Sequence, residues 1–195
     1  MGERDTSFAR LVSLAAHDLR TPLATINGFA QTLVRMGGLE EPKGRYMEMI
    51  AAASSQLADL LDELGLAARI EAGRYEPNLQ EVDTLELARG AAADLGEERV
   101  GVGGVGGTVR VDVDATQRGL SALARCALRH GGLERVDLRA DETQVTIAPV
   151  TAASAPVLLG RDLRDLGAAV AVRLVEALGG SVSVDGGTAV VRLPT

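Results

Sequence analysis

Two long segments in the first half of the chain repeat hydrophobic residues every three or four positions, the spacing that places them on one face of an α-helix. The pattern predicts helices from about Thr6 to Met36 and from just after Pro42 to about Gly73, with Gly37 and Gly38 ending the first. The first buried stripe is expected to contain Phe8, Leu11, Val12, Ala15, Leu19, Leu23, Ile26, Ala30 and Leu33. The second follows nearly a heptad repeat and contains Tyr46, Ile50, Ala53, Leu57, Leu60, Leu61, Leu64 and Ala67.

Two helices of this length, joined by a short connection, are expected to form an antiparallel hairpin. A single hairpin leaves both hydrophobic stripes half covered. Two hairpins cover them by closing a four-helix bundle. The pattern therefore predicts a homodimer formed through the hairpin.

Beyond residue 74 the pattern changes to shorter helices and alternating strands. Helices are expected from Thr84, as the capping residue, to about Leu95, from Asp114 to Gly131, and from about Leu163 to Leu178. Strands are expected at 79–82, 108–113, 136–140, 144–147, 181–184 and 189–193, with a loop over 149–160. The predicted fold class is α+β, with a helical hairpin over residues 1–74 and an α/β sandwich over residues 75–195.

The glycine-rich run Gly101–Gly107 contains the spacing G-x-G-x-x-G, which is typical of dinucleotide-binding loops. Such a loop needs a helix N-terminus directly after it, because the free N–H groups of the helix bind the phosphates. Here an alternating, strand-like segment follows instead. We therefore interpret the run as a flexible turn between short strands.

The amino-acid composition argues against several classes of function. The chain has 195 residues and 46% hydrophobic residues, so it can build a core, and its net charge of −7 with scattered basic residues argues against a nucleic-acid partner. The single cysteine, Cys126, excludes an intramolecular disulfide and fits a reducing compartment. No run of eighteen apolar residues occurs and the N-terminal residues are polar, so we expect a cytoplasmic protein without a membrane segment or signal peptide.

His17 stands out because it lies on the polar face of the first helix. It is two residues from both Ala15 and Leu19, which places it about 200° around the helix from each. An exposed imidazole is a nucleophile near neutral pH, and the carboxylate of Asp18 next to it can orient the ring or take its proton. Pro22 has no N–H to donate to the carbonyl of Asp18, so the helix is expected to bend there.

The run from His17 to Leu23, which reads HDLRTPL, resembles the H-box of bacterial sensor histidine kinases. The resemblance implies that His17 carries a phosphoryl group and that Asp18 accepts its proton. It also implies that Thr21 orients water against a partner's phosphoaspartate. Arg20 and Pro22 are expected at the surface that meets the partner, which is the receiver domain of a response regulator.

The rest of the chain resembles the ATP-binding domain of the same kinases (the Bergerat fold), most clearly at Arg173–Val182 and Val190–Pro194. Three nucleotide motifs of that family depart from their usual form. Cys126 stands where the family has an asparagine that binds magnesium, residues 148–153 lack the usual aspartate and glycines, and Gly167 alone remains of a glycine-rich box. We therefore expect ATP binding to be lost, with no cofactor and no metal site.

Three hypotheses about function are consistent with these residues. The favoured one is a histidine phosphotransferase or phosphatase that exchanges a phosphoryl group between His17 and a receiver aspartate. The alternatives are an active ATP- and magnesium-dependent kinase with divergent motifs, and a non-catalytic pseudokinase scaffold. Dimerisation through the hairpin alone is a further possibility. A His17→Ala variant separates transfer from scaffolding, because only transfer needs the imidazole.

Overall fold

The computed structural model describes residues 6–38, 41–93 and 95–195, and the side chains from Val12 onward within these ranges. Phe8 and Leu11 of the predicted stripe therefore lie outside the described side chains. The chain divides into two compact units, Met1–Tyr75 and Glu76–Thr195. Each unit is described by itself.

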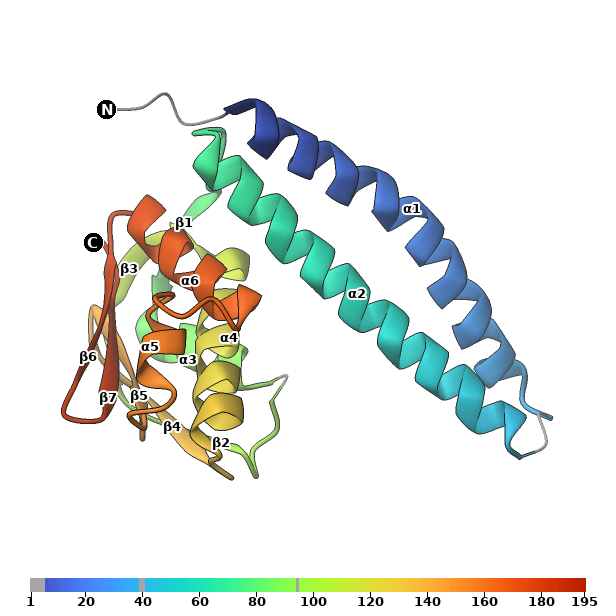
Figure 1. Cartoon of the computed structure of the whole chain (residues 1–195). Coiled ribbons are helices and arrows are strands. Elements are labelled where there is room, and N and C mark those ends of the chain that lie inside the picture. The colour runs from blue at the N-terminus through green and yellow to red at the C-terminus, as the bar shows by residue number, and fades with distance from the viewer. Residues whose placement is uncertain (1–5, 39–40, 94) are drawn as a thin grey trace. The chain divides into compact units, whose positions relative to one another are not determined.

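The first unit is a hairpin of two long helices, α1 (Thr6–Met36) and α2 (Lys43–Glu71), which run antiparallel side by side (Figure 1). Gly37 and Gly38 have φ angles of 65° and 73°, in the left-handed region that favours glycine. The glycine pair therefore ends α1 as the sequence predicts, and both predicted helices are confirmed.

Small residues line the contact between α1 and α2. Ala16, Leu23 and Ala30 recur every seven positions on α1 and are 1%, 8% and 3% exposed. They meet a face of α2 on which Ser54, Gly65 and Ala68 are buried. A Cβ added at Gly65 would lie 3.9 Å from the Cβ of Ala16, so the two helices approach closely at this level.

The predicted hydrophobic stripe on α1 is only partly covered in the single chain, as the sequence predicts for a single hairpin. Leu19, Ile26 and Leu33 remain 55%, 51% and 40% exposed. The reason is geometric: within the hairpin α1 has one neighbouring helix, which covers only the side of α1 that contains Ala16, Leu23 and Ala30. The other side of the stripe faces solvent.

The second unit is built on a five-stranded sheet in the order β2-β4-β5-β7-β6. Its strands are β2 (Val100–Gly106), β4 (Val136–Glu142), β5 (Gln144–Ala148), β6 (Ser181–Asp185) and β7 (Thr188–Arg192). β2 pairs parallel to β4, and the other neighbours are antiparallel. The helices lie on one face of this sheet, so the predicted α/β sandwich is confirmed (Figure 1).

Three helices cover the sheet: α3 (Thr84–Ala93), α4 (Val113–Gly131) and α6 (Leu166–Ala177). Alternate residues of the central strands point into the core, for example Val145 and Ile147 of β5, both 0% exposed. With so few aromatic residues, the core consists of Leu, Val, Ala and Ile together with Cys126.

A second, two-stranded sheet pairs β1 (Leu79–Asp83) with β3 (Thr108–Asp112) in antiparallel register. It leads into α3, where the predicted capping role of Thr84 is wrong. The cap is Asp83, whose Oδ1 accepts the N–H of Leu85 at 2.7 Å. The Thr84 hydroxyl instead donates to the carbonyl of Glu142 and accepts from the N–H of Gly107, which holds α3 to the end of β4.

The glycine run is a strand, which corrects its interpretation as a turn. Gly101 to Gly106 belong to β2, at one edge of the sheet. A Cβ at Gly104, where φ is +99°, would lie 2.0 Å from the carbonyl oxygen of Ala140. The glycines therefore allow a backbone approach to β4 that larger residues would prevent.

Two aspartates set the starts of the longer helices of the second unit. Asp112 caps α4 by accepting the N–H of Ala115, so α4 starts just before the predicted Asp114. Asp165 caps α6 by accepting the N–H of Ala168, so α6 starts three residues later than predicted. The predicted loop over 149–160 contains one short helix, α5 (Ala155–Leu158). Among the described residues, no helix is both long enough and apolar enough to span a lipid bilayer.

Candidate functional site

His17 lies in the first half of α1, and its side chain is 75% exposed. The apolar positions of α1 turn toward α2 or lie beside that contact, which leaves the ring on the polar face that the sequence predicts. Nδ1 of the ring lies 3.1 Å from Oδ1 of Asp18, whose own side chain is 67% exposed. In the tautomer with its proton on Nδ1, the ring donates to the carboxylate and keeps a lone pair on Nε2.

The residues that follow His17 lie on the same exposed stretch of α1. Thr21 follows four residues later and therefore lies on the same helix face, one turn along. Pro22 is exposed within α1, and the helix continues through it without the hydrogen bond that a proline nitrogen cannot donate. The structure places His17, Asp18 and Thr21 within one stretch of exposed helix surface.

Arg20 has a partner within the hairpin. Its Nε and Nη2 donate to Oδ1 of Asp62 on α2 at 3.1 and 2.5 Å. Both side chains are about half exposed, 45% for Arg20 and 48% for Asp62. This ion pair joins the two helices at the level of His17, and a role for Arg20 toward a partner protein stays a prediction.

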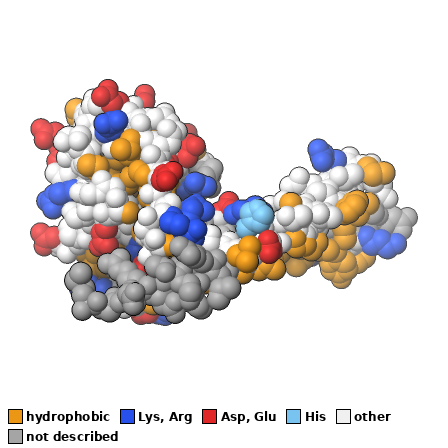
Figure 2. Space-filling view, turned by 90° about the horizontal axis from the view of Figure 1, so that it is seen from above, with side chains coloured by type: hydrophobic (Ala, Val, Ile, Leu, Met, Phe, Trp, Pro, Cys, Tyr) orange, Lys and Arg blue, Asp and Glu red, His pale blue; other side chains and the backbone are white. Residues whose placement is uncertain are grey.

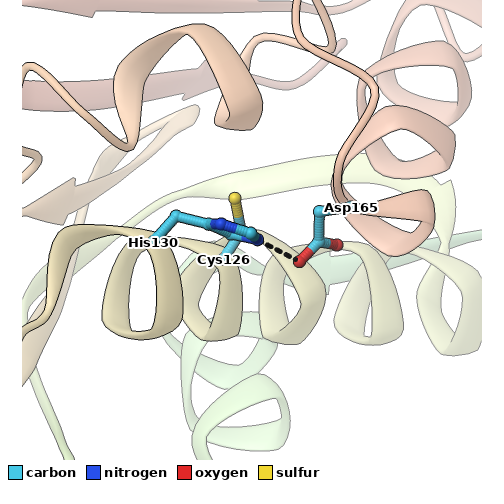
Figure 3. Close-up of side chains that lie close together, drawn as sticks. All are labelled: Cys126, His130 and Asp165. Carbon is cyan, nitrogen blue, oxygen red and sulfur yellow. Dashed lines mark hydrogen bonds and ion pairs between the residues drawn. The ribbon is translucent and has the colours of Figure 1, made fainter.

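The three divergent motifs of the second unit come together around the C-terminal half of α4. Cys126 lies on this part of α4 and is 0% exposed. The segment after β5 reaches the end of the same helix, since a Cβ at Gly131 would lie 3.3 Å from the Thr151 hydroxyl. Asp165, at the start of α6, lies close to the same residues (Figure 3).

The side chains described at these positions are a thiol and two hydroxyls. Burial, helped by the negative charge of Asp165, raises the pKa of the Cys126 thiol from 9.0 to about 12, so the group is a neutral thiol at pH 7. In the segment after β5, the backbone N–H groups of Thr151 and Ser154 each donate to the hydroxyl of the other residue. The side chains there are thus engaged within their own turn.

Sequence reasoning missed two polar residues in this region. His130 and Asp165 form a partly buried pair, with 3.2 Å between Nε2 and Oδ2 and side chains 16% and 13% exposed. The spacing of Cys126 and His130, four residues apart on one helix, was the available signal for one face bearing both groups. Nothing in the sequence indicated that Asp165, thirty-five residues further along, would meet them.

Comparison with known proteins agrees with the geometry of both units. The His Kinase A (phospho-acceptor) domain family matches residues 9–73. The probable sensor histidine kinase TcrY of Mycobacterium tuberculosis is 34% identical over 70 residues, which is 36% of this chain and 15% of TcrY. The histidine protein kinase DivJ of Caulobacter vibrioides is 31% identical over 121 residues, which is 59% of this chain and 20% of DivJ.

The solved structure of full-length ShkA in complex with AMPPNP shares the fold. It superposes with a TM-score of 0.68 at 22% identity and covers 93% of this chain and 44% of the ShkA chain. This chain therefore corresponds to a small part of each curated relative and to less than half of ShkA. The phospho-acceptor match shows a His Kinase A domain over residues 9–73, and the sequence relatives together with the shared fold support a member of the sensor histidine kinase family.

Proposed function

We propose that this chain carries a phosphoryl group on Nε2 of His17 and exchanges it with the phosphorylated aspartate of a response-regulator receiver domain. The observation that carries the proposal is the exposed His17 ring hydrogen-bonded through Nδ1 to Asp18. A partner can reach an exposed ring, and the carboxylate fixes which nitrogen keeps the lone pair.

The transfer step follows from this arrangement. The lone pair on Nε2 attacks the phosphorus of the acyl phosphate, the N–P bond forms, and the P–O bond to the aspartate carboxylate breaks. Positive charge develops on the ring, and Asp18 stabilises it through the Nδ1 proton or accepts that proton. Such a step depends mainly on positioning and charge stabilisation, and the receiver brings its own magnesium ion.

Thr21 gives the same surface a second activity in this proposal. It lies one turn beyond His17, where its hydroxyl can orient a water molecule against the phosphoaspartate of a docked receiver. Pro22 belongs to the surface offered to that receiver. Arg20 contributes by holding α2 beside this stretch of α1 through Asp62.

We also propose that the second unit has lost ATP binding and needs no nucleotide or magnesium. A buried thiol at Cys126 is a poor ligand for magnesium, which prefers oxygen. The N-terminus of α6 is occupied by the carboxylate of Asp165, whose charge repels phosphate from a helix end that otherwise attracts it. Both features support a domain that keeps the fold without the nucleotide chemistry.

The proposed assembly is a homodimer through the hairpin. Large apolar side chains line the exposed surface of both helices, among them Leu19, Ile26, Ile50, Leu57 and Leu60. Figure 2 shows hydrophobic side chains gathered along one side of the hairpin. A four-helix bundle would bury this surface.

The test is transfer from phosphorylated receiver domains to the purified chain, with phosphohistidine as the readout. We expect wild type to remove phosphate from at least one receiver through a transient phosphohistidine, and His17→Ala to accept none. Glu176→Gln, an exposed change on α6, is the matched control and should behave as wild type.

Two other outcomes distinguish the alternatives. Phosphohistidine formed at His17 from ATP and magnesium alone would overturn the proposed loss of ATP binding and establish an active kinase. A receiver that binds wild type and His17→Ala equally, with no transfer to either, would establish a scaffold and overturn the transfer proposal.

A further inference from the structure

Three side chains with metal-binding atoms meet in the second unit, and the proposed function uses none of them as a ligand. Cys126 and His130 lie one turn apart on α4, and Asp165 directly precedes α6. One ligand atom from each, the thiol sulfur, a ring nitrogen and a carboxylate oxygen, all lie within 4.8 Å of one another. Figure 3 shows the three side chains converging between the two helices.

The spacing of these atoms is close to that of a tetrahedral metal site. With metal–ligand bonds of about 2.0–2.3 Å, tetrahedral geometry places ligand atoms roughly 3.3–3.8 Å apart. The 3.2 Å between Nε2 of His130 and Oδ2 of Asp165 is near that value. An ion can therefore enter with side-chain shifts of about an ångström or less.

The surroundings hold the ligands in place. Oδ1 of Asp165 accepts the N–H of Ala168 at 3.1 Å, which fixes the carboxylate and leaves Oδ2 toward His130. The side chains of His130 and Asp165 are only 16% and 13% exposed, and Cys126 is fully buried. Ligands that are oriented by neighbouring hydrogen bonds and shielded from water are typical of metal sites in proteins.

We propose that Cys126, His130 and Asp165 bind a transition-metal ion, in the first place Zn²⁺, with the fourth coordination position left open. The ligand types decide the ion, because thiolate and imidazole favour zinc whereas magnesium prefers oxygen alone. Binding forms S–Zn, N–Zn and O–Zn bonds, and the thiol proton passes to solvent. The Nε2 lone pair of His130 faces the ion, so the ring proton lies on Nδ1.

This inference is independent of the proposed phosphoryl transfer at His17, since the site and His17 lie in different units of the chain. It replaces the expectation that the chain has no metal site. The resulting centre would be a transition-metal site at the position where the sequence resemblance implies that other family members bind magnesium.

Cobalt provides the sharpest test, because Cys126 is the chain's single cysteine. We expect Co²⁺ added to the metal-free full chain to give a thiolate-to-cobalt charge-transfer band and the visible bands of tetrahedral cobalt, saturating at one ion per chain. Zn²⁺ should then displace the cobalt and abolish both bands. Any thiolate band must originate from Cys126.

Matched variants separate this site from adventitious binding. Asp165→Asn keeps an oxygen to cap α6 but removes the carboxylate ligand, and we expect it to weaken cobalt binding about a hundredfold. Cys126→Ser and His130→Gln should do the same, whereas His17→Ala should bind as wild type. Zn²⁺ should also raise the melting temperature of wild type but not of Asp165→Asn.

Two results would overturn the proposal. A metal-free chain that shows neither a thiolate band with cobalt nor a Zn²⁺-dependent change in melting temperature contains only a His130–Asp165 ion pair. A cobalt spectrum that persists unchanged in Asp165→Asn and His130→Gln would assign the metal to other groups.

Discussion

At the scale of single residues, the hydrogen bond between His17 and Asp18 leads to the first prediction. Asp18→Asn keeps a hydrogen-bond acceptor beside Nδ1 but removes the negative charge that stabilises the ring during transfer. We expect the rate of phosphoryl transfer to His17 to fall about a hundredfold, within the usual range for a lost acid–base group. The free energy of unfolding should change little, since both side chains are mostly exposed.

The measurement is a single-turnover transfer assay from a phosphorylated receiver, with thermal unfolding recorded on the same samples. Asp59→Asn, on exposed α2, changes charge by the same amount and provides the control. A transfer rate equal to that of wild type would show that Asp18 has no part in the reaction.

The raised pKa of the Cys126 thiol predicts how the free energy of unfolding changes at alkaline pH. The thiol's pKa is about 12 in the folded chain against 9.0 ordinarily, so the folded state holds this proton more tightly than the unfolded state. The resulting stabilisation is fully present below pH 9.0 and is lost as pH rises toward about 12. In this pH range the thiol lowers the free energy of unfolding by at most about 1.4 kcal/mol per pH unit.

Urea unfolding of the metal-free chain between about pH 8 and about pH 11 checks this, with Cys126→Ala as the reference. Every other ionisable group is the same in both proteins, so the difference between the slopes of the two proteins isolates the thiol. We expect the free energy of unfolding to fall less steeply in Cys126→Ala than in wild type. Parallel slopes would contradict the raised pKa.

At the scale of elements, the ion pair between Arg20 and Asp62 predicts a modest coupling between α1 and α2. Both side chains are about half exposed, so solvent screens the interaction and we expect a coupling of about 0.5–1 kcal/mol. A double-mutant cycle with Arg20→Ala and Asp62→Ala, measured by urea unfolding in low salt, gives this value directly. The coupling should shrink at high salt, and additive effects of the two changes would rule it out.

The proline inside α1, Pro22, suggests a substitution that should stabilise this helix. Pro22→Ala restores an N–H that donates to the carbonyl of Asp18 and replaces the least favourable helix residue with the most favourable one. Since Pro22 is exposed and packs little, we expect a gain of about 1–3 kcal/mol in the free energy of unfolding. Ala24→Gly, on the exposed surface of the same helix, should lower it by about 1 kcal/mol. An unchanged or lower stability of Pro22→Ala would show that α1 is already adapted to the proline.

The elements that the sequence predicted are those with a strong local pattern. The two long helices and the strand pairs of the second unit follow directly from hydrophobic periodicity. The glycine run could not be predicted as a strand, because glycine has no side chain to alternate and the pairing depends on how closely β2 approaches β4. The helix starts at Asp112 and Asp165 were missed by one to three residues, because several neighbouring polar residues compete to cap a helix.

The two candidate sites also differ in how far the sequence could predict them. His17 was predictable, because a polar residue opposite an apolar stripe is a property of a single helix. The meeting of Cys126 and His130 with Asp165 was not, because it depends on the packing of α4 against α6. Tertiary contacts of this kind leave no periodic signal in one sequence.

At the scale of the whole molecule, the exposed apolar surface of the hairpin leads to the last prediction. Tyr46, Ile50, Ala53, Leu57 and Leu60 follow heptad spacing on α2 and are all exposed in the single chain. A stripe of this length in water favours association with a second copy, since two such stripes bury each other. We therefore expect wild type to be a dimer in solution.

Leu57→Glu places a charge at the centre of that stripe, and we expect it to shift the protein to monomer, because burying an unpaired carboxylate outweighs the apolar contacts that remain. Ala52→Glu introduces the same side chain on the same helix, at an exposed position about 120° away from the centre of the stripe, and should leave the dimer intact. Sedimentation equilibrium over a range of concentrations distinguishes the two. A wild type that remains monomeric would refute the dimer. A dimer that survives Leu57→Glu while Ala52→Glu breaks it would assign the interface to a different face of the hairpin.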